Sequence, residues 1–182
     1  YPSADKSLPA RYARSISMFR KGDTKNAIPI IDSLIRDIPE NPYFWELKGQ
    51  ALLEGGAPAK ALASLRQANK LLPNSGLIQI LYAQALIATE DRANIKQALN
   101  LLTLAKKTER DSVDVYKYSA LAYGYLNDLP RAELATAEMA MMQGDTALAS
   151  EKAKRVIGQF KHGSPEWMKA NDVLNFTSKE RN

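Results

Sequence analysis

The sequence predicts an all-α protein, a solenoid of about ten antiparallel helices. The first observation behind this prediction is an internal repeat, since residues 34 positions apart match in type over the first half of the chain. The matched pairs are Met18 with Leu52, Gly22 with Gly56, Ala27 with Ala61, Ile31 with Leu65, and Pro39 with Pro73. The second is the composition: 45% hydrophobic and 25% charged residues are ordinary values for a folded globular chain.

The period of 34 residues is typical of the tetratricopeptide repeat (TPR), a helix–turn–helix unit. Residues 41–74 fit its pattern best, and only Lys48 stands where a small or apolar residue is usual. The large-aromatic, small, large, small, large, small and proline places hold Trp45, Gly49, Leu52, Ala61, Leu65, Ala68 and Pro73. We expect Gly49 and Ala61 where the two helices cross closely, because larger side chains would push the axes apart.

The first unit, near residues 8–41, keeps the pattern of its second helix but has Ser15 at the glycine place. Its turn at residues 21–24 combines a glycine that ends one helix with an Asp or Thr that caps the next. Pro29 lies inside the second helix, so we expect that helix to be bent or to start late.

The third unit spans residues 76–112 and the fourth residues 113–144. In the third unit, Ala98 is taken as the small residue of the second helix, three positions later than the strict period. We therefore expect the loop at residues 90–94 to hold the three inserted residues. The fourth unit has Tyr116, Ala120, Tyr123 and Ala132 in register.

After residue 144 the period shortens, and residues 145–177 are expected to form closing helices. The TPR superhelix is thus predicted over residues 8–177. The chain begins Tyr-Pro-Ser without an initiator methionine or a signal peptide, so residues 1–7 are interpreted as a linker from a missing upstream domain. The polar residues 178–182 are expected to form a frayed tail.

Nothing in the sequence predicts a catalytic, cofactor-binding or metal-binding residue in this piece. It has one histidine, His162, no cysteine, and no HExxH or phosphate-binding loop. The net charge of +5 is spread thinly, which argues against a nucleic-acid partner. No apolar run approaches the roughly 20 residues that a transmembrane helix needs.

Binding of protein or peptide clients is the function that the repeat favours, on the concave face formed by the first helices of the units. The residues predicted to bind protein are Tyr12, Phe19, Tyr43, Glu46, Gln50 and Gln84. The three aromatic residues are not required at the core places of their units, and exposed aromatic side chains are frequent binding hot spots. An equally weighted alternative is that this face packs against a missing domain of the same chain.

Three segments carry a closer resemblance: Asn-Pro-Tyr-Phe-Trp-Glu-Leu-Lys-Gly-Gln at residues 41–50, Ala-Tyr-Gly at 122–124 with Gln-Gly-Asp at 143–145, and Gly-Ser-Pro-Glu-Trp at 163–167. They resemble the C-terminal TPR domain of periplasmic BepA-like zinc metalloproteases. In that family an upstream domain carries HExxH and the zinc, and none of those residues is in this piece.

The resemblance implies a non-catalytic interaction domain of a zinc-dependent metalloendopeptidase. It would dock substrates or outer-membrane assembly partners for the missing catalytic domain, which would hold zinc and be a partner of this domain. It also implies a periplasmic, possibly membrane-associated location. The alternative is a stand-alone TPR adaptor or scaffold with no protease attached, and a third, less favoured interpretation is an RNA-binding helical repeat.

Overall fold

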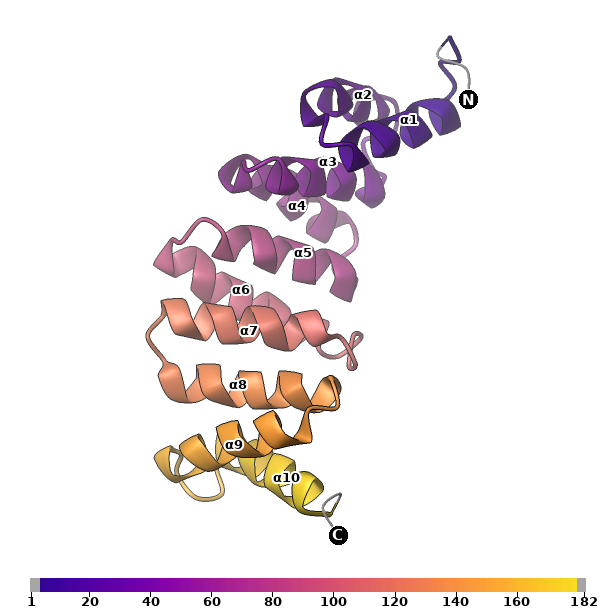
Figure 1. The fold of residues 1–182 in the computed structure, drawn as a ribbon. Coiled ribbons are helices and arrows are strands. Elements are labelled where there is room, and N and C mark those ends of the chain that lie inside the picture. Colours follow the sequence, from indigo (N-terminus) through magenta and orange to yellow (C-terminus); the bar gives the residue numbers. More distant parts are fainter. Residues whose placement is uncertain (1–3, 180–182) are drawn as a thin grey trace.

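The computed structural model describes residues 4–179 as ten α-helices and one 3-10 turn, with no strand among those residues (Figure 1). The helices are α1 (Leu8–Arg20), α2 (Thr24–Asp37), α3 (Pro42–Glu54), α4 (Pro58–Leu71), α5 (Gly76–Ile87), α6 (Arg92–Ala105), α7 (Val113–Tyr125), α8 (Leu129–Met142), α9 (Thr146–Val156) and α10 (Pro165–Lys179), with η1 (Ile157–Gln159) after α9. They stack in sequence order, with the two termini at opposite ends. The prediction of an all-α solenoid is confirmed.

The turn inside each unit sets the repeat. The residues at positions 22, 56 and 90 all have positive φ angles, of 78°, 75° and 57°. Glycine adopts this conformation freely, whereas an L side chain such as that of Glu90 costs roughly 1–2 kcal/mol there. The helix–turn–helix period of 34 residues is therefore kept at the third turn without the glycine that marks the first two.

A hydrogen bond from the first helix of a unit also repeats with this period. Trp45 Nε1 donates to the carbonyl oxygen of Pro39 at 2.7 Å, and Gln79 Nε2 donates to that of Pro73 at the same distance. Both bonds tie the start of a first helix to the end of the preceding unit. Gln79 thus keeps the hydrogen bond of the large-aromatic place without its ring.

The helices α3 and α4 cross closely, as predicted. A Cβ atom added at Gly49 would lie 2.4 Å from Cγ of Leu65, and Ala61 has no exposed surface. Lys48, the departure from the repeat pattern, pairs with Asp32 of α2 at 2.7 Å. A charged side chain is accommodated at that place because it reaches the preceding unit.

Two details of the sequence prediction are wrong. Helix α2 starts at Thr24 with Asp23 as its cap, so Pro29 does not delay it. Helix α6 starts 34 residues after α4 and also ends in register with it, but α7 starts 37 residues after α5. The three inserted residues therefore lie in the loop at residues 106–112, not in the loop at 90–94. Ile95, rather than Ala98, is the equivalent of Ala61.

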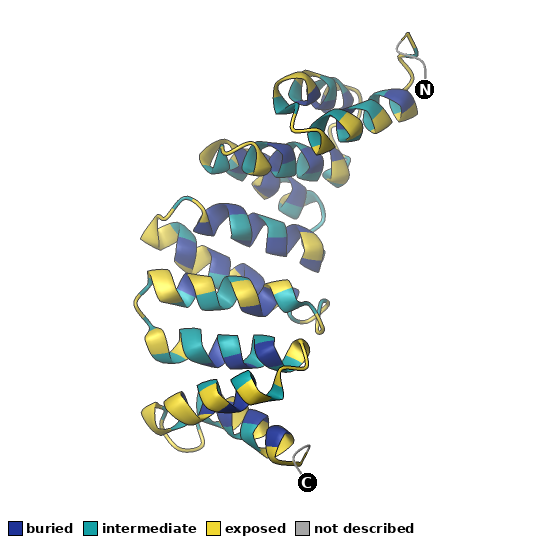
Figure 2. Ribbon diagram, viewed as in Figure 1, coloured by how far each residue is buried: buried dark blue, intermediate teal, exposed yellow. Residues whose placement is uncertain are grey.

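The described ends of the chain continue the stack. Residues 1–3 of the expected linker and 180–182 of the expected tail lie outside the described residues, while Ser178 and Lys179 extend α10. Buried side chains line the inner sides of the helices from α1 to α10 (Figure 2). Within residues 4–179, no helix combines the length and the apolar character needed to cross a membrane.

The register predicts the effect of enlarging Ala61. Substitution Ala61→Leu should lower the free energy of unfolding by roughly 1–3 kcal/mol, because the fully buried methyl group leaves no space for a larger side chain. Ala63→Leu is the matched control, since Ala63 is exposed on the same helix. Urea denaturation followed by circular dichroism measures both, and equal midpoints for the two variants would contradict the register.

Candidate functional site

A groove lies between the first helices of the first two units, α1 and α3. It has a volume of about 260 Å³ and brings together five of the six residues predicted to bind protein. Those five are Tyr12, Phe19, Tyr43, Glu46 and Gln50. The sixth, Gln84, lies half-buried on α5 and does not line the groove. The repeat spacing thus places most of the predicted residues around one cavity.

The aromatic residues of the groove differ in their roles. The rings of Tyr12 and Phe44 are 5.7 Å apart, and Phe44 belongs to the core between α2 and α3. Tyr12 and Phe19 both pack partly against that core, so the expectation that the core does not need them is wrong. Tyr43 remains 54% exposed and is the aromatic side chain that stands free at the rim.

Glu46 is the unusual charged residue of the groove. Its side chain is half-buried and forms no hydrogen bond or ion pair with any described residue, and burial raises the pKa of its carboxyl group. Gln50 is already bonded to Glu54 at 2.9 Å. Arg20, at the end of α1, lines the groove but makes no ion pair with Glu46. The groove therefore combines apolar walls with a carboxylate that lacks a cation.

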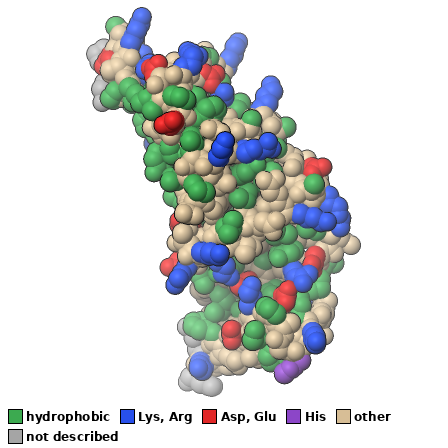
Figure 3. Space-filling model, turned by 180° about the vertical axis from the view of Figure 1, so that it is seen from behind, with side chains coloured by type: hydrophobic (Ala, Val, Ile, Leu, Met, Phe, Trp, Pro, Cys, Tyr) green, Lys and Arg blue, Asp and Glu red, His purple; other side chains and the backbone are tan. Residues whose placement is uncertain are grey.

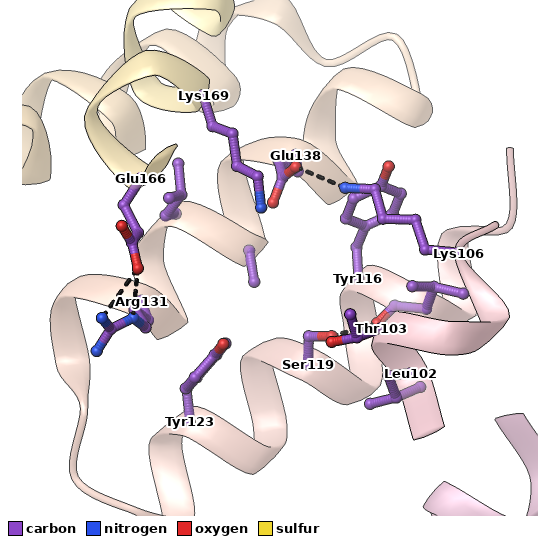
Figure 4. Close-up of a pocket in the computed structure, with 13 residues that line it drawn as sticks. Leu102, Thr103, Lys106, Tyr116, Ser119, Tyr123, Arg131, Glu138, Glu166 and Lys169 are labelled. Atoms are coloured by element: carbon purple, nitrogen blue, oxygen red, sulfur yellow. Dashed lines mark hydrogen bonds and ion pairs between the residues drawn. The ribbon is translucent and has the colours of Figure 1, made fainter. Parts of the chain in front are cut away.

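Sequence reasoning missed a second cavity, of about 140 Å³, between α6, α7, α8 and α10 (Figure 4). Its charged residues pair across elements that are far apart in the sequence. Lys106, directly after α6, donates to Glu138 of α8 at 2.9 Å and lies 4.4 Å from the centre of the Tyr116 ring. Arg131 of α8 donates two hydrogen bonds, at 3.0 and 2.9 Å, to Glu166 of α10.

These pairs shift the pKa values of their members in the directions expected for ion pairs. Hydrogen bonds to Asp128 and then Glu166 raise the pKa of Arg131. Glu166 has a lowered pKa, first through its own backbone N–H and then through Arg131. Burial opposes the charge of Lys106, but Glu138 outweighs it and the pKa is raised. The pocket's two carboxylates are thus held ionised and already bonded.

Among residues 4–179, no group of three or more His, Asp or Glu side chains is placed to hold a metal ion. The exposed ring of His162 lies 4.2 Å from the ring of Trp167, a contact between the loop and the start of α10.

The comparisons with known proteins identify the repeat type. Residues 31–147, more than half of the chain, match the model of the cytochrome c-type biogenesis protein H TPR domain. A MamA structure from Desulfovibrio magneticus RS-1 has a TM-score of 0.71 and 16% identity, covering 98% of each chain. A thermophilic TPR protein from Thermus thermophilus has a TM-score of 0.59 and 16% identity, covering 93% of this chain and 100% of its own. No curated protein matches the chain.

At these identities the solved structures establish the fold and nothing about partners. The family match contradicts the resemblance to the C-terminal domain of BepA-like metalloproteases, because the model that fits is a different TPR domain. The residues behind that resemblance are turn and packing residues that many TPR units share. The protease domain as a partner, with its zinc, therefore loses its support.

The buried Glu46 predicts a pH-dependent effect on stability. Since the pKa is raised in the folded chain, the ionised carboxylate destabilises it above that pKa, and the penalty disappears below the ordinary value of 4.5. Substitution Glu46→Gln should thus increase the free energy of unfolding at pH 7 but not at about pH 4. Denaturant titrations at both pH values test this.

The matched control for that experiment is Glu40→Gln, since Glu40 is exposed in the loop before α3. It should change stability little at either pH. A loss of stability for Glu46→Gln at pH 7 would mean that the carboxylate has a stabilising partner in solution.

Proposed function

The chain belongs to the family of the cytochrome c-type biogenesis protein H TPR domain, and we propose that it acts as an adaptor whose α1–α3 groove holds an extended segment of a partner protein. A TPR domain is a protein–protein interaction domain. The alternative considered from the sequence, a TPR adaptor, is therefore preferred over an accessory domain of a protease.

One observation carries the proposal: an unpaired, half-buried carboxylate lies beside an exposed aromatic ring in the same groove. Burying a charge is costly unless an opposite charge pairs with it. A Lys or Arg side chain of a partner would pair with Glu46 and lie over the ring of Tyr43, where a cation is also attracted. The groove thus favours a segment with a basic residue next to large apolar residues.

The family supplies a first partner class to try. Its description concerns cytochrome c-type biogenesis, so proteins of that process are the natural partners to test first. A periplasmic location is part of this proposal. A nucleic-acid partner is not, because an unpaired carboxylate in the groove would repel phosphates.

The proposal is tested with a labelled peptide that has a Leu-Arg-Phe core between Gly-Ser flanks, by fluorescence anisotropy. Substitution Tyr43→Ala should weaken its binding roughly tenfold, about 1.4 kcal/mol, as expected for an aromatic hot spot. Leu77→Ala is the matched control, because Leu77 holds the equivalent place 34 residues later, is 62% exposed and lies outside the groove.

A second arm isolates the charge preference. The parent chain should bind the Leu-Arg-Phe peptide better than a peptide with citrulline in place of Arg, and Glu46→Gln should abolish that difference. If Tyr43→Ala and Leu77→Ala bound the peptide equally well, the groove would not be the binding surface. If citrulline bound as well as Arg to the parent, the role of Glu46 would be wrong.

A further inference from the structure

The pocket between α6, α7, α8 and α10 holds more hydrogen-bond donors than its own acceptors use. Glu138 is bonded to Lys106 and Glu166 to Arg131. Lys169 and the hydroxyl group of Tyr123 form no hydrogen bond with any described residue, although both line the cavity. Figure 4 shows the Lys169 side chain reaching from α10 and the Tyr123 hydroxyl from α7 toward the same open space.

The charge count of the lining favours a ligand with one negative charge. Lys106, Arg131 and Lys169 carry three positive charges, while Glu138 and Glu166 carry two negative charges. One carboxylate would balance the excess, whereas a phosphate dianion would also face the two glutamates. The volume of about 140 Å³ corresponds to four or five water molecules at roughly 30 Å³ each, enough for one acidic side chain.

An apolar groove of about 290 Å³ adjoins this pocket and shares Tyr116, Glu138 and Lys169 with it. Its other walls include Met141 and Met142 of α8 and Val173 and Phe176 of α10. Met142 is 43% and Phe176 47% exposed. Methionine side chains adapt to different apolar shapes, so this groove suits a large apolar side chain of a ligand.

We propose that the pocket and its adjoining groove form a second binding site, which takes a partner segment with an Asp or Glu next to a large apolar residue. The acidic side chain accepts hydrogen bonds from Lys169 and Tyr123, with Lys106 adding charge, and the apolar residue lies between α8 and α10. The face seen in Figure 3 fits this assignment, since basic and acidic side chains alternate with apolar ones over its C-terminal half.

The site differs from the α1–α3 groove in charge preference and in the helices that build it. The α1–α3 groove uses first helices of units and offers a free carboxylate. The second site uses α6, α8 and α10 around α7 and offers a free ammonium group. The proposal therefore does not depend on the groove assignment.

The test uses the full chain and two labelled peptides, with Glu-Phe or Gln-Phe at the centre of Gly-Ser flanks. Binding is measured by anisotropy and mapped by ¹H–¹⁵N chemical-shift changes. The Glu-Phe peptide should bind more tightly than the Gln-Phe peptide and shift the amides of α8 and α10. Lys169→Met should weaken Glu-Phe binding about five- to tenfold and leave Gln-Phe binding unchanged.

Lys179→Met is the matched control, because Lys179 is exposed on the same helix and does not line the pocket. It should bind like the parent, and Tyr123→Phe should lose part of the Glu-Phe preference without loss of helicity. Tyr43→Ala should leave Glu-Phe binding intact, which separates this proposal from the function of the α1–α3 groove.

Four results would overturn the proposal. The first is parent binding of Glu-Phe no tighter than that of Gln-Phe, and the second is equal loss in the Lys169→Met and Lys179→Met variants. The third is tighter binding of a phosphoserine-Phe peptide than of Glu-Phe, which would contradict the preference for a single charge. The fourth is loss of Glu-Phe binding in Tyr43→Ala, which would place the peptide in the α1–α3 groove.

Discussion

The close crossing of paired helices is the constraint on which the rest of the structure depends. At the α3–α4 crossing the absence of a side chain at Gly49 lets Leu65 fill the space that a Cβ atom would need. A pair held this closely presents a fixed outer side of its first helix to the next unit. When the positive-φ turns repeat every 34 residues, α1 and α3 come to lie side by side, and the groove forms between them.

The repeat made the fold and most of the α1–α3 groove predictable, because one residue type in register fixes the face on which its neighbours lie. Its limits appear where two residues serve the same need. Ala98 was assigned to the place of Ala61 because both are small, yet Ile95 holds that place. Likewise Glu90 takes the turn conformation of Gly22 and Gly56, so the third turn carried no glycine to mark it.

The pocket at α10 was not predictable from the repeat pattern, since α10 lies beyond the region where the period holds. A signal was nevertheless present in the charges. Lys106 and Glu138 are 32 residues apart, and Arg131 and Glu166 are 35 apart. Stacked units bring residues about one period apart face to face, so opposite charges at this spacing indicate contacts between units. By contrast, packing and turn residues are shared by many TPR domains, which is why three short segments suggested the wrong family.

The positions of the two proposed sites limit what a partner can be. A segment lying along the first helices meets Tyr43 and Glu46, but the second site opens between α6, α8 and α10. One short extended segment cannot occupy both, because the sites belong to different helices at opposite ends of the stack (Figure 1). Their charge preferences are also opposite, so a segment suited to Glu46 is repelled by Lys169. A chain with both sites would hold two different segments at once, which is the arrangement of a scaffold rather than of a single-client receptor.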